Sequence, residues 1–334
     1  MRVSVVDIGT NSTRLLIADV TPEGGVTELE RHSTVTRLGQ GVDTAGALAP
    51  EAMERVFATL RTYRGLIDGH DAGARTVAVL TSAVRDAANG EAFTARVRDD
   101  LHLDARTITG EEEAQLTFLG ATASRDASAP TPVAVIDIGG GSTEIVVGER
   151  GTVAFHVSTQ AGVVRQSERH IHHDPPAGDE LIATAEDVRA IFALGVPEAV
   201  RASVRAGVAV AGTATSCAAI AQALEPYDPA RVHGYRLSRA ECERILARLA
   251  GMDEAERRTV PGLHPDRAPT IVPGVLMLIE AMRLLGLDDV QVSEHDILRG
   301  AALRLAQTAE TDGLLAAESS AFPISVPPPG RVSD

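Results

Sequence analysis

Residues 132–148 read PVAVIDIGGGSTEIVVG, an apolar run that ends in Asp137 and three glycines before a second apolar run begins. The same pattern stands at the N-terminus, where residues 3–20 read VSVVDIGTNSTRLLIADV. The two stretches align without a gap, and the identical positions include Asp7 with Asp137, Gly9 with Gly139, Ser12 with Ser142, and Thr13 with Thr143. The repeat predicts two similar halves that face each other, each built around a strand, a polar tight turn and a second strand.

Each copy predicts a β-hairpin whose turn binds phosphate. Glycine lets the backbone approach a ligand closely, and successive N–H groups of a turn form a concavity that attracts anions. The Asp at the end of each first strand would repel an anion, so we expect it to hold a divalent cation or its waters beside the phosphates. One such hairpin is a weak signal, because Asp-Gly turns mostly just join strands. Two matched copies are a much stronger one.

Composition narrows the possible functions of the 334-residue chain, whose length suggests about two domains. The net charge of −15 disfavours nucleic-acid partners and acidic membrane surfaces. The sequence contains no lysine, which excludes a Walker-type lysine and Schiff-base chemistry and leaves phosphate recognition to backbone N–H groups, arginine and Mg²⁺. Neither a signal peptide nor a membrane-spanning segment is recognisable, and the two cysteines are too few for a disulfide framework. We therefore expect a cytoplasmic protein.

A second group of candidate residues follows the expected strand at 76–80. The chain continues there as TSAVRDAAN before an expected helix at 91–101. Ligands of α/β proteins are held beyond the carboxyl ends of strands, so Arg85 is a candidate phosphate ligand with Ser82 as a hydrogen-bonding neighbour. A plain surface arginine is the alternative, because charged side chains are mostly exposed.

Three consecutive acids, Glu111 to Glu113, open the next expected helix, which runs through residue 121. Acids favour the positive end of the helix dipole, and Thr109 with Glu112 has the spacing of a capping box. A carboxylate at this place could also take a proton from an attacking water. The residues alone leave both roles open for Glu112.

The small, polar stretch 123–131 predicts a linker between two domains. A later strand at 207–211 ends in a Gly-hydroxyl turn, and Thr213 of this turn is a weaker candidate for anion binding before an expected helix at 217–224. Near the C-terminus a last strand at 290–293 precedes the motif SEHDILRG and a helix to about residue 307. The remaining residues predict a disordered tail.

The chain resembles the exopolyphosphatase / guanosine pentaphosphate phosphohydrolase family of the actin-like ATPase superfamily. The matching stretches are DIGTNSTRLL, TSAVRDAAN, ITGEEEAQLTFLG, DIGGGSTEIVVG, AGTAT and SEHDILRG, in family order across residues 1–308. Within this family, the chain resembles most the short, two-domain members of actinobacterial type. One departure is Pro269, where members commonly carry Asp after Arg-Ala.

The resemblance implies an α/β protein with two ribonuclease H-like domains of actin/hexokinase type and an active-site cleft between them. Domain I would comprise residues 1–122 with about 290–308, domain II residues 123–289, and the disordered tail residues 309–334. It implies Glu112 as catalytic base, with Glu113 as the alternative, and Arg85 as the catalytic arginine. The implied metal ligands are Asp7, Asp137 and Glu144, and the implied phosphate-binding residues are Gly9, Thr10, Asn11, Ser12, Arg14, Ser82, Gly139, Gly140, Gly141, Ser142 and Thr213.

The implied activity is Mg²⁺-dependent hydrolysis of a terminal phosphoanhydride bond, with Mn²⁺ as an alternative cofactor. The substrate would be inorganic polyphosphate, with short chains favoured by the acidic balance and the absence of lysine, or the alarmone pppGpp of the stringent response. A homodimer is expected from the superfamily. Two alternatives stay open at this stage: an ATP-dependent small-molecule kinase on the same fold, and a regulator that binds ppGpp or pppGpp without hydrolysis.

Overall fold

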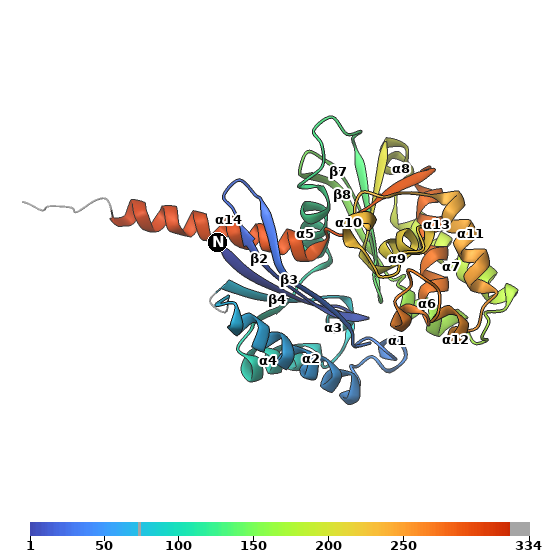
Figure 1. Cartoon of the computed structure of the whole chain (residues 1–334), viewed down its shortest axis with the longest axis horizontal. Coiled ribbons are helices and arrows are strands. Elements are labelled where there is room, and N and C mark those ends of the chain that lie inside the picture. The colour runs from blue at the N-terminus through green and yellow to red at the C-terminus, as the bar shows by residue number, and fades with distance from the viewer. Residues whose placement is uncertain (73–74, 321–334) are drawn as a thin grey trace, which may run out of the picture.

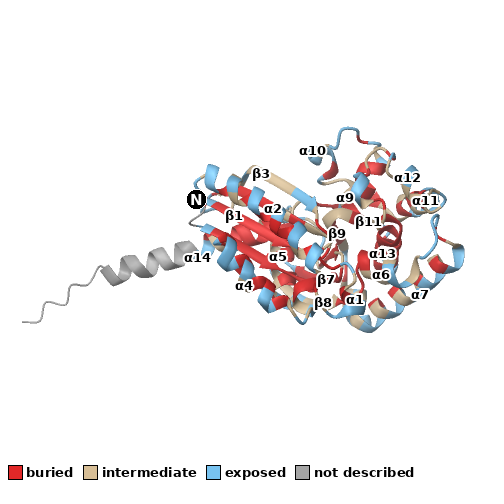
Figure 2. Ribbon diagram, turned by 90° about the horizontal axis from the view of Figure 1, so that it is seen from below, coloured by how far each residue is buried: buried red, intermediate tan, exposed pale blue. Residues whose placement is uncertain are grey.

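The chain forms two β-sheets, each with helices on both faces (Figures 1 and 2). The structure is a computed structural model and describes residues 1–72 and 75–320. Both repeated stretches form the predicted hairpins at equivalent central places in their sheets. The two-domain α/β prediction is therefore confirmed in its main feature.

The first sheet has the strand order β3-β2-β1-β4-β5. Strands β1 and β2 pair antiparallel, whereas β4 and β5 continue the sheet in parallel. Two helices cover one face, one carrying Phe57 and the other Phe93. The aromatic rings of these two side chains pack edge to face in the core. The elements are β1 (Arg2–Ile8), β2 (Ser12–Val20), β3 (Val26–Val35), α1 (Val42–Ala45), α2 (Pro50–Gly69), β4 (Thr76–Leu80), α3 (Ser82–Asp86), α4 (Gly90–Leu101), β5 (Asp104–Thr107) and α5 (Gly110–Thr122).

The second sheet repeats this plan and adds one antiparallel strand, in the order β10-β11-β9-β6-β7-β8. Its larger core lies under α7, α9, α11 and α13. The elements are β6 (Val133–Ile138), β7 (Thr143–Glu149), β8 (Thr152–Thr159), α6 (Val163–His170), α7 (Gly178–Gly195), α8 (Glu198–Ser203), β9 (Ala206–Val210), α9 (Ala211–Ala221), α10 (Pro229–Val232), β10 (Arg236–Ser238), α11 (Arg239–Ala250), α12 (Glu254–Arg257), η2 (Pro265–Arg267), α13 (Ile271–Leu284), β11 (Asp289–Val292) and α14 (Ile297–Ser320). Within residues 1–72 and 75–320, no helix is long and apolar enough to cross a membrane.

The two halves exchange their last helices. Helix α14 ends the second half but packs on β1 and β2 of the first sheet, where Leu298 and Ala302 join the core around Val3 and Val5. Helix α5 ends the first half but packs on β6, β7 and β8 of the second sheet through Phe118. Each sheet is thus covered on one face by a helix from the other half of the chain, as Figure 1 shows for α14 and α5.

Helices α5 and α14 cross at two glycines. A Cβ placed on Gly120 would lie 1.9 Å from the carbonyl oxygen of Asp296, and one placed on Gly300 would lie 1.8 Å from that of Leu116. Such distances are far inside van der Waals contact, so the backbones touch and neither position has room for a methyl group. The crossing therefore fixes how closely the two halves approach.

Two expected boundaries differ from the structure. We placed the return to domain I at about residue 290, but β11 pairs with β9 and β10 inside the second sheet, so the return begins only after Val292. We also expected a disordered tail from 309 to 334, whereas α14 remains helical to Ser320. Its Ala, Leu and Glu residues are strong helix formers, which explains the longer helix. The rest of the expected tail, residues 321–334, lies outside the described residues.

Substitution at the helix crossing should destabilise the protein. We expect Gly120→Ala and Gly300→Ala each to lower the free energy of unfolding in urea by about 1–3 kcal/mol, because the methyl group pushes the helices apart. Gly65→Ala is the matched control, since Gly65 lies inside α2 with nothing within 4 Å of an added Cβ. That control should stabilise the protein by about 0.5–1 kcal/mol. Equal stability of all three variants would contradict the close crossing.

Candidate active site

The first turn is fastened to its own half through its carbonyl oxygens. Gly9 N–H donates to the carbonyl of Ser12 at 3.0 Å and closes the turn between β1 and β2. The Thr10 carbonyl accepts from Gly39 N–H at 2.8 Å, and the Asn11 carbonyl accepts from the N–H groups of residues 36 and 37 at 3.0 and 2.9 Å. With its carbonyls held by the segment that follows β3, the turn has its N–H side left for an anion.

The second turn is held in the same way by α6. Gly139 N–H donates to the carbonyl of Ser142 at 3.0 Å. The carbonyls of Gly139 and Gly140 accept from the first two N–H groups of α6, both at 2.9 Å. The Gly141 carbonyl accepts from Nε of Arg165 at 2.9 Å. The repeat in the sequence is thus also a repeat in how each turn is anchored.

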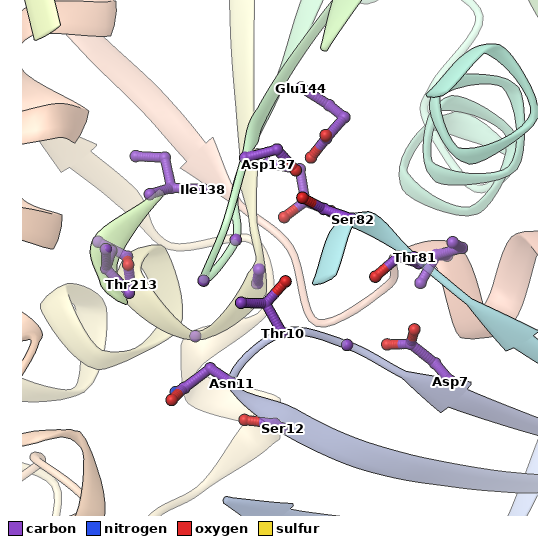
Figure 3. A pocket seen from close by; sticks show the side chains of 18 of the residues that line it. Asp7, Thr10, Asn11, Ser12, Thr81, Ser82, Asp137, Ile138, Glu144 and Thr213 are labelled. Carbon is purple, nitrogen blue, oxygen red and sulfur yellow. The ribbon is translucent and has the colours of Figure 1, made fainter. Parts of the chain in front are cut away.

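The two turns touch each other across the cleft (Figure 3). A Cβ on Gly140 would lie 2.9 Å from the backbone nitrogen of Asn11. A Cβ on Gly141 would lie 2.9 Å from both Thr10 Oγ1 and Ser82 Oγ. The last two glycines of the run, Gly140 and Gly141, are therefore required by the close approach of the first half, whereas a Cβ on Gly139 would meet only the carbonyl of Ser142 in its own turn, at 3.1 Å.

A cavity of about 100 Å³ lies at this contact. Fourteen of the predicted site residues line it: Asp7, Gly9, Thr10, Asn11, Ser12, Arg14, Ser82, Glu113, Asp137, Gly139, Gly140, Ser142, Glu144 and Thr213. Gly141 borders the same place through its contact with Thr10 and Ser82. Thr213 arrives there from the first turn of α9, which begins at Ala211 directly after β9, and so the turn expected ahead of this helix is instead part of it. The structure thus brings together residues from both halves.

The repeat breaks at one position, and the break makes the cleft electrically asymmetric. In the first hairpin Asp7 stands opposite Arg14, and in the second Asp137 stands opposite Glu144. Arg14 donates to Asp7 Oδ2 through Nε at 2.8 Å and Nη2 at 2.6 Å, and its Nη1 contacts Asp296. One aspartate is therefore neutralised by an arginine, while its counterpart faces another acid.

Burial and mutual repulsion raise the pKa values of the acids on the second side. Burial, opposed by Arg14 and reinforced by neighbouring carboxylates, raises the pKa of Asp137 to about 7. Burial and then the charge of Asp137 raise the pKa of Glu144 to about 7, although Ser142 and Ser158 hydrogen-bond to it. Raised pKa values mean that the folded protein holds these groups as carboxylates at a free-energy cost near neutral pH.

The donor set fits a hard divalent cation such as Mg²⁺. Asp7, Asp137 and Glu144 offer carboxylate oxygens, and Asp7 Oδ1 is buried without a hydrogen-bond partner among the residues described. No group of three or more His, Cys, Asp or Glu side chains in the described part of the chain is arranged to hold a metal ion alone. A cation at this place would therefore need waters or substrate phosphates as further ligands, as Mg²⁺ commonly has.

Glu112, the residue expected to act as catalytic base, does not line the cavity. Its side chain is 44% exposed, and Oε2 accepts from Thr109 N–H at 2.9 Å while Thr109 Oγ1 accepts from Glu112 N–H at 3.1 Å. This is a complete capping box, so the helix-cap interpretation of the sequence was the correct one.

Glu113, the alternative base, is the buried acid of the cavity. Its Oε2 accepts from Nη1 of Arg85 at 3.1 Å, and the same nitrogen donates to the carbonyl of Ile108 at 3.0 Å. Burial, followed by the charge of Glu144, raises the pKa of Glu113 well above its ordinary value, against the opposing effect of Arg85. Arg85 thus reaches the cavity through Glu113.

Sequence reasoning missed two charged residues of the site. Asp296 contacts Arg14 across the halves, and it lies in the motif SEHDILRG, to which no site role was given. Arg267 lines the cavity and is packed on Gly212, where a Cβ would lie 1.4 Å from Nη1. Burial lowers the pKa of Arg267, and no carboxylate pairs with it within the described residues. Pro269 itself lies in the turn before α13 and does not line the cavity.

Comparison with known proteins agrees with this geometry. The model of the Ppx/GppA phosphatase family matches residues 16–308. The chain belongs to this family. This Ppx/GppA protein is 41% identical over 317 residues to exopolyphosphatase 2 of Mycobacterium tuberculosis, an alignment that covers 91% of the chain and 98% of that protein.

Solved structures of Ppx/GppA proteins share the fold. A crystal structure of an exopolyphosphatase-like protein is 32% identical, with a TM-score of 0.85, and covers 92% of this chain and all of its own. The Aquifex aeolicus member is 29% identical, with a TM-score of 0.77, and the match covers 92% of this chain and 98% of that one. The two-domain fold predicted for this Ppx/GppA protein is therefore confirmed.

The acids of the second hairpin should make the metal-free protein less stable as pH rises. A group whose folded pKa is raised contributes its full stability below its unfolded pKa and loses it as pH rises through its folded pKa. For Glu144 this window runs from about 4.5 to about 7. We therefore expect Glu144→Gln to raise the melting temperature of the metal-free protein, measured in EDTA, at pH 8. At pH 4 the substitution should leave the melting temperature unchanged.

The control for this measurement is Glu149→Gln, because Glu149 is exposed at the end of the same strand. This substitution should leave the melting temperature unchanged at both pH values. Added Mg²⁺ should narrow the gap at pH 8 between Glu144→Gln and the unaltered protein, because a cation compensates the buried charges. A melting temperature of Glu144→Gln that follows the unaltered protein at both pH values would contradict the buried, repelling acids.

Proposed function

We propose that this protein is a phosphohydrolase that removes the terminal phosphate from inorganic polyphosphate, with pppGpp as a further substrate. The observation that carries the proposal is the buried Glu113 carboxylate, held by Arg85 beside a cavity formed by two anchored glycine turns. The name exopolyphosphatase 2 of the mycobacterial relative supports polyphosphate as the substrate.

In this proposal the terminal phosphate lies between the two turns. Backbone N–H groups of both turns and the hydroxyls of Thr10, Ser82 and Ser142 would donate to its oxygens. Mg²⁺ held by Asp7, Asp137 and Glu144 would neutralise charge on the phosphates. Positioning and electrostatics would supply most of the rate, since phosphoryl transfer needs little covalent chemistry from the protein.

Glu113 is the proposed general base. A water oxygen forms the new bond to phosphorus, its proton passes to Glu113, and the phosphorus bond to the bridging oxygen breaks, with its electron pair left on the shortened chain. Because Arg85 engages Oε2, Oε1 is the oxygen assigned to water. A pKa above the ordinary carboxyl range suits a base that works near neutral pH.

Exchange of a single carboxylate for an amide tests this assignment. We expect Glu113→Gln to lower phosphate release from tripolyphosphate by about 10²- to 10⁴-fold, because the amide cannot accept the proton. Glu112→Gln is the matched control, and Gln also completes a capping box, so its turnover should stay near that of the unaltered protein. Loss of turnover in Glu112→Gln alone would return the base role to Glu112.

A second, larger cavity supports pppGpp as a substrate. It has a volume of about 880 Å³ and shares Arg14, Ala211, Gly212 and Arg267 with the first cavity. Its lining also includes Tyr227 and the paired rings of His233 and His295, whose centroids are 4.2 Å apart. Flat aromatic and histidine rings suit a nucleoside base, and the arginines suit the phosphates that join it to the first cavity.

Tyr227→Ala separates the two substrates. The variant should raise KM for pppGpp by about tenfold, the loss expected when one base loses a stacking partner, and leave KM for tripolyphosphate unchanged. Phosphate release with Mg²⁺ is the measurement for both. An equal change for the two substrates would contradict the assignment of this cavity to the nucleoside. Acceptor-dependent ADP formation from ATP would instead favour a kinase.

A further inference from the structure

Arg165 is bonded to both halves of the protein at once. Its Nε donates to the carbonyl of Gly141 in the second turn at 2.9 Å. Its Nη1 contacts Asp43 of α1, and its Nη2 donates to Asp86 of α3 at 3.2 Å. The side chain is only 11% exposed, so these three acceptors enclose it. A single planar guanidinium thus ties a phosphate turn of one half to two helices of the other.

Neighbouring residues of α6 extend this contact along the outer rim of the cleft. Nε of Arg169 donates to Asp43 Oδ2 at 2.8 Å, and Oε1 of Glu168 accepts from Gly41 N–H at 3.1 Å. We call Arg165, Glu168, Arg169, Asp43 and Asp86 the rim cluster. Every one of these bonds joins α6 to the first half, so separation of the halves breaks all of them.

The rim cluster reaches the proposed reaction centre through α3. This short helix carries Ser82 on the cavity, Arg85 on Glu113 and Asp86 on Arg165. Ser82 Oγ also donates to Asp86 Oδ2 at 3.4 Å. Asp86 thus shares one five-residue helix with the residue that bonds Glu113 and with a residue that lines the first cavity.

We propose that Arg165 is a positioning residue that couples closure of the cleft to the geometry of the second phosphate turn. With the halves closed, its terminal nitrogens are held by Asp43 and Asp86, and its Nε then fixes the Gly141 carbonyl. With the halves apart, both carboxylates are lost, and the bond from Nε to the Gly141 carbonyl, which lies within the second half, is no longer held in place by them. The expected effect of Arg165 on turnover rests on the proposed function. The expected effect of Arg165 on closure of the cleft does not depend on it.

Three acceptors in different directions require the guanidinium fork. Arginine presents five N–H donors in a fixed plane, whereas lysine is a single point charge that cannot reach all three acceptors. We therefore expect Arg165→Lys to behave as a partial loss, between the unaltered protein and Arg165→Ala.

The first test measures closure without substrate, as the radius of gyration from small-angle X-ray scattering. Arg165→Ala and Asp43→Asn should each increase the radius of gyration, and high salt should increase that of the unaltered protein, because salt weakens ion pairs at the protein surface. Arg236→Ala is the control, because Arg236 is 76% exposed and pairs with Asp289 within the second sheet. An unchanged radius of gyration in both rim variants would overturn the proposal.

The second test is a double-mutant cycle on tripolyphosphate hydrolysis with Mg²⁺. Arg165→Ala should lower kcat/KM by about tenfold or more, the loss expected of a charge-assisted bond network. Adding Asp43→Asn to Arg165→Ala should cost less activity than Asp43→Asn costs in the unaltered protein, because only the bond from Arg169 to Asp43 is left to lose. Additive losses would overturn the proposal, and so would full activity of Arg165→Lys.

The two tests separate failure of the inference from failure of the proposed function. If the unaltered protein releases no phosphate from tripolyphosphate or pppGpp, the proposed function fails while the scattering measurement still decides whether Arg165 closes the cleft. A melting temperature for each variant distinguishes loss of closure from loss of folding. Arg165→Ala should keep a cooperative transition, because its partners lie on the rim and outside both hydrophobic cores.

Discussion

The structure depends on backbone contact between two glycine turns. Gly140 and Gly141 lie so close to Thr10 and Asn11 that no side chain fits between them. Such contact is stable only when each turn is rigid on its own side, and both are: their carbonyl oxygens are bonded from behind, one turn by the segment after β3 and the other by α6. Anchoring from behind leaves the N–H sides of both turns in one small space, which is what a terminal phosphate group requires.

The second constraint is uncompensated negative charge. The hairpins are near copies, yet Arg14 in one is replaced by Glu144 in the other, so the carboxylates gather on one side of the cleft. Glu113 joins them from α5, and Arg85 offsets only part of the repulsion. A site of this kind is less stable empty than full, and the same repulsion that raises the pKa values favours a bound cation. In the proposed function, the free-energy cost of the empty site would contribute to the affinity for a bound cation.

The hairpins, the sheet elements and the grouping of most site residues could be predicted, because each depends on local sequence: an apolar run, an Asp and a glycine turn. Which of the two adjacent acids, Glu112 or Glu113, lines the cavity could not be predicted by the same means. Adjacent residues of a helix point about 100° apart, so Glu112 turning back to cap Thr109 leaves Glu113 facing the cleft. The Thr109-to-Glu112 spacing carries this information, because it predicts the capping box that turns the Glu112 side chain back to Thr109. Asp296 and Arg267 depend on contacts between distant segments, for which the sequence offers no local pattern.

The exchange of α5 and α14 has a consequence for synthesis of the chain on the ribosome. Val3, Val5 and Leu16 belong to an apolar face that is buried under residues 297–306. That face is synthesised before the whole second half of the chain, but its cover follows only after that half. Until residues 297–306 are synthesised, the N-terminal half therefore exposes this apolar surface to water, and such a state is prone to aggregation. The two halves look like separate domains, yet each depends on the other for one covering helix. A gene cut between them would yield two fragments, each without the helix that covers one face of its sheet.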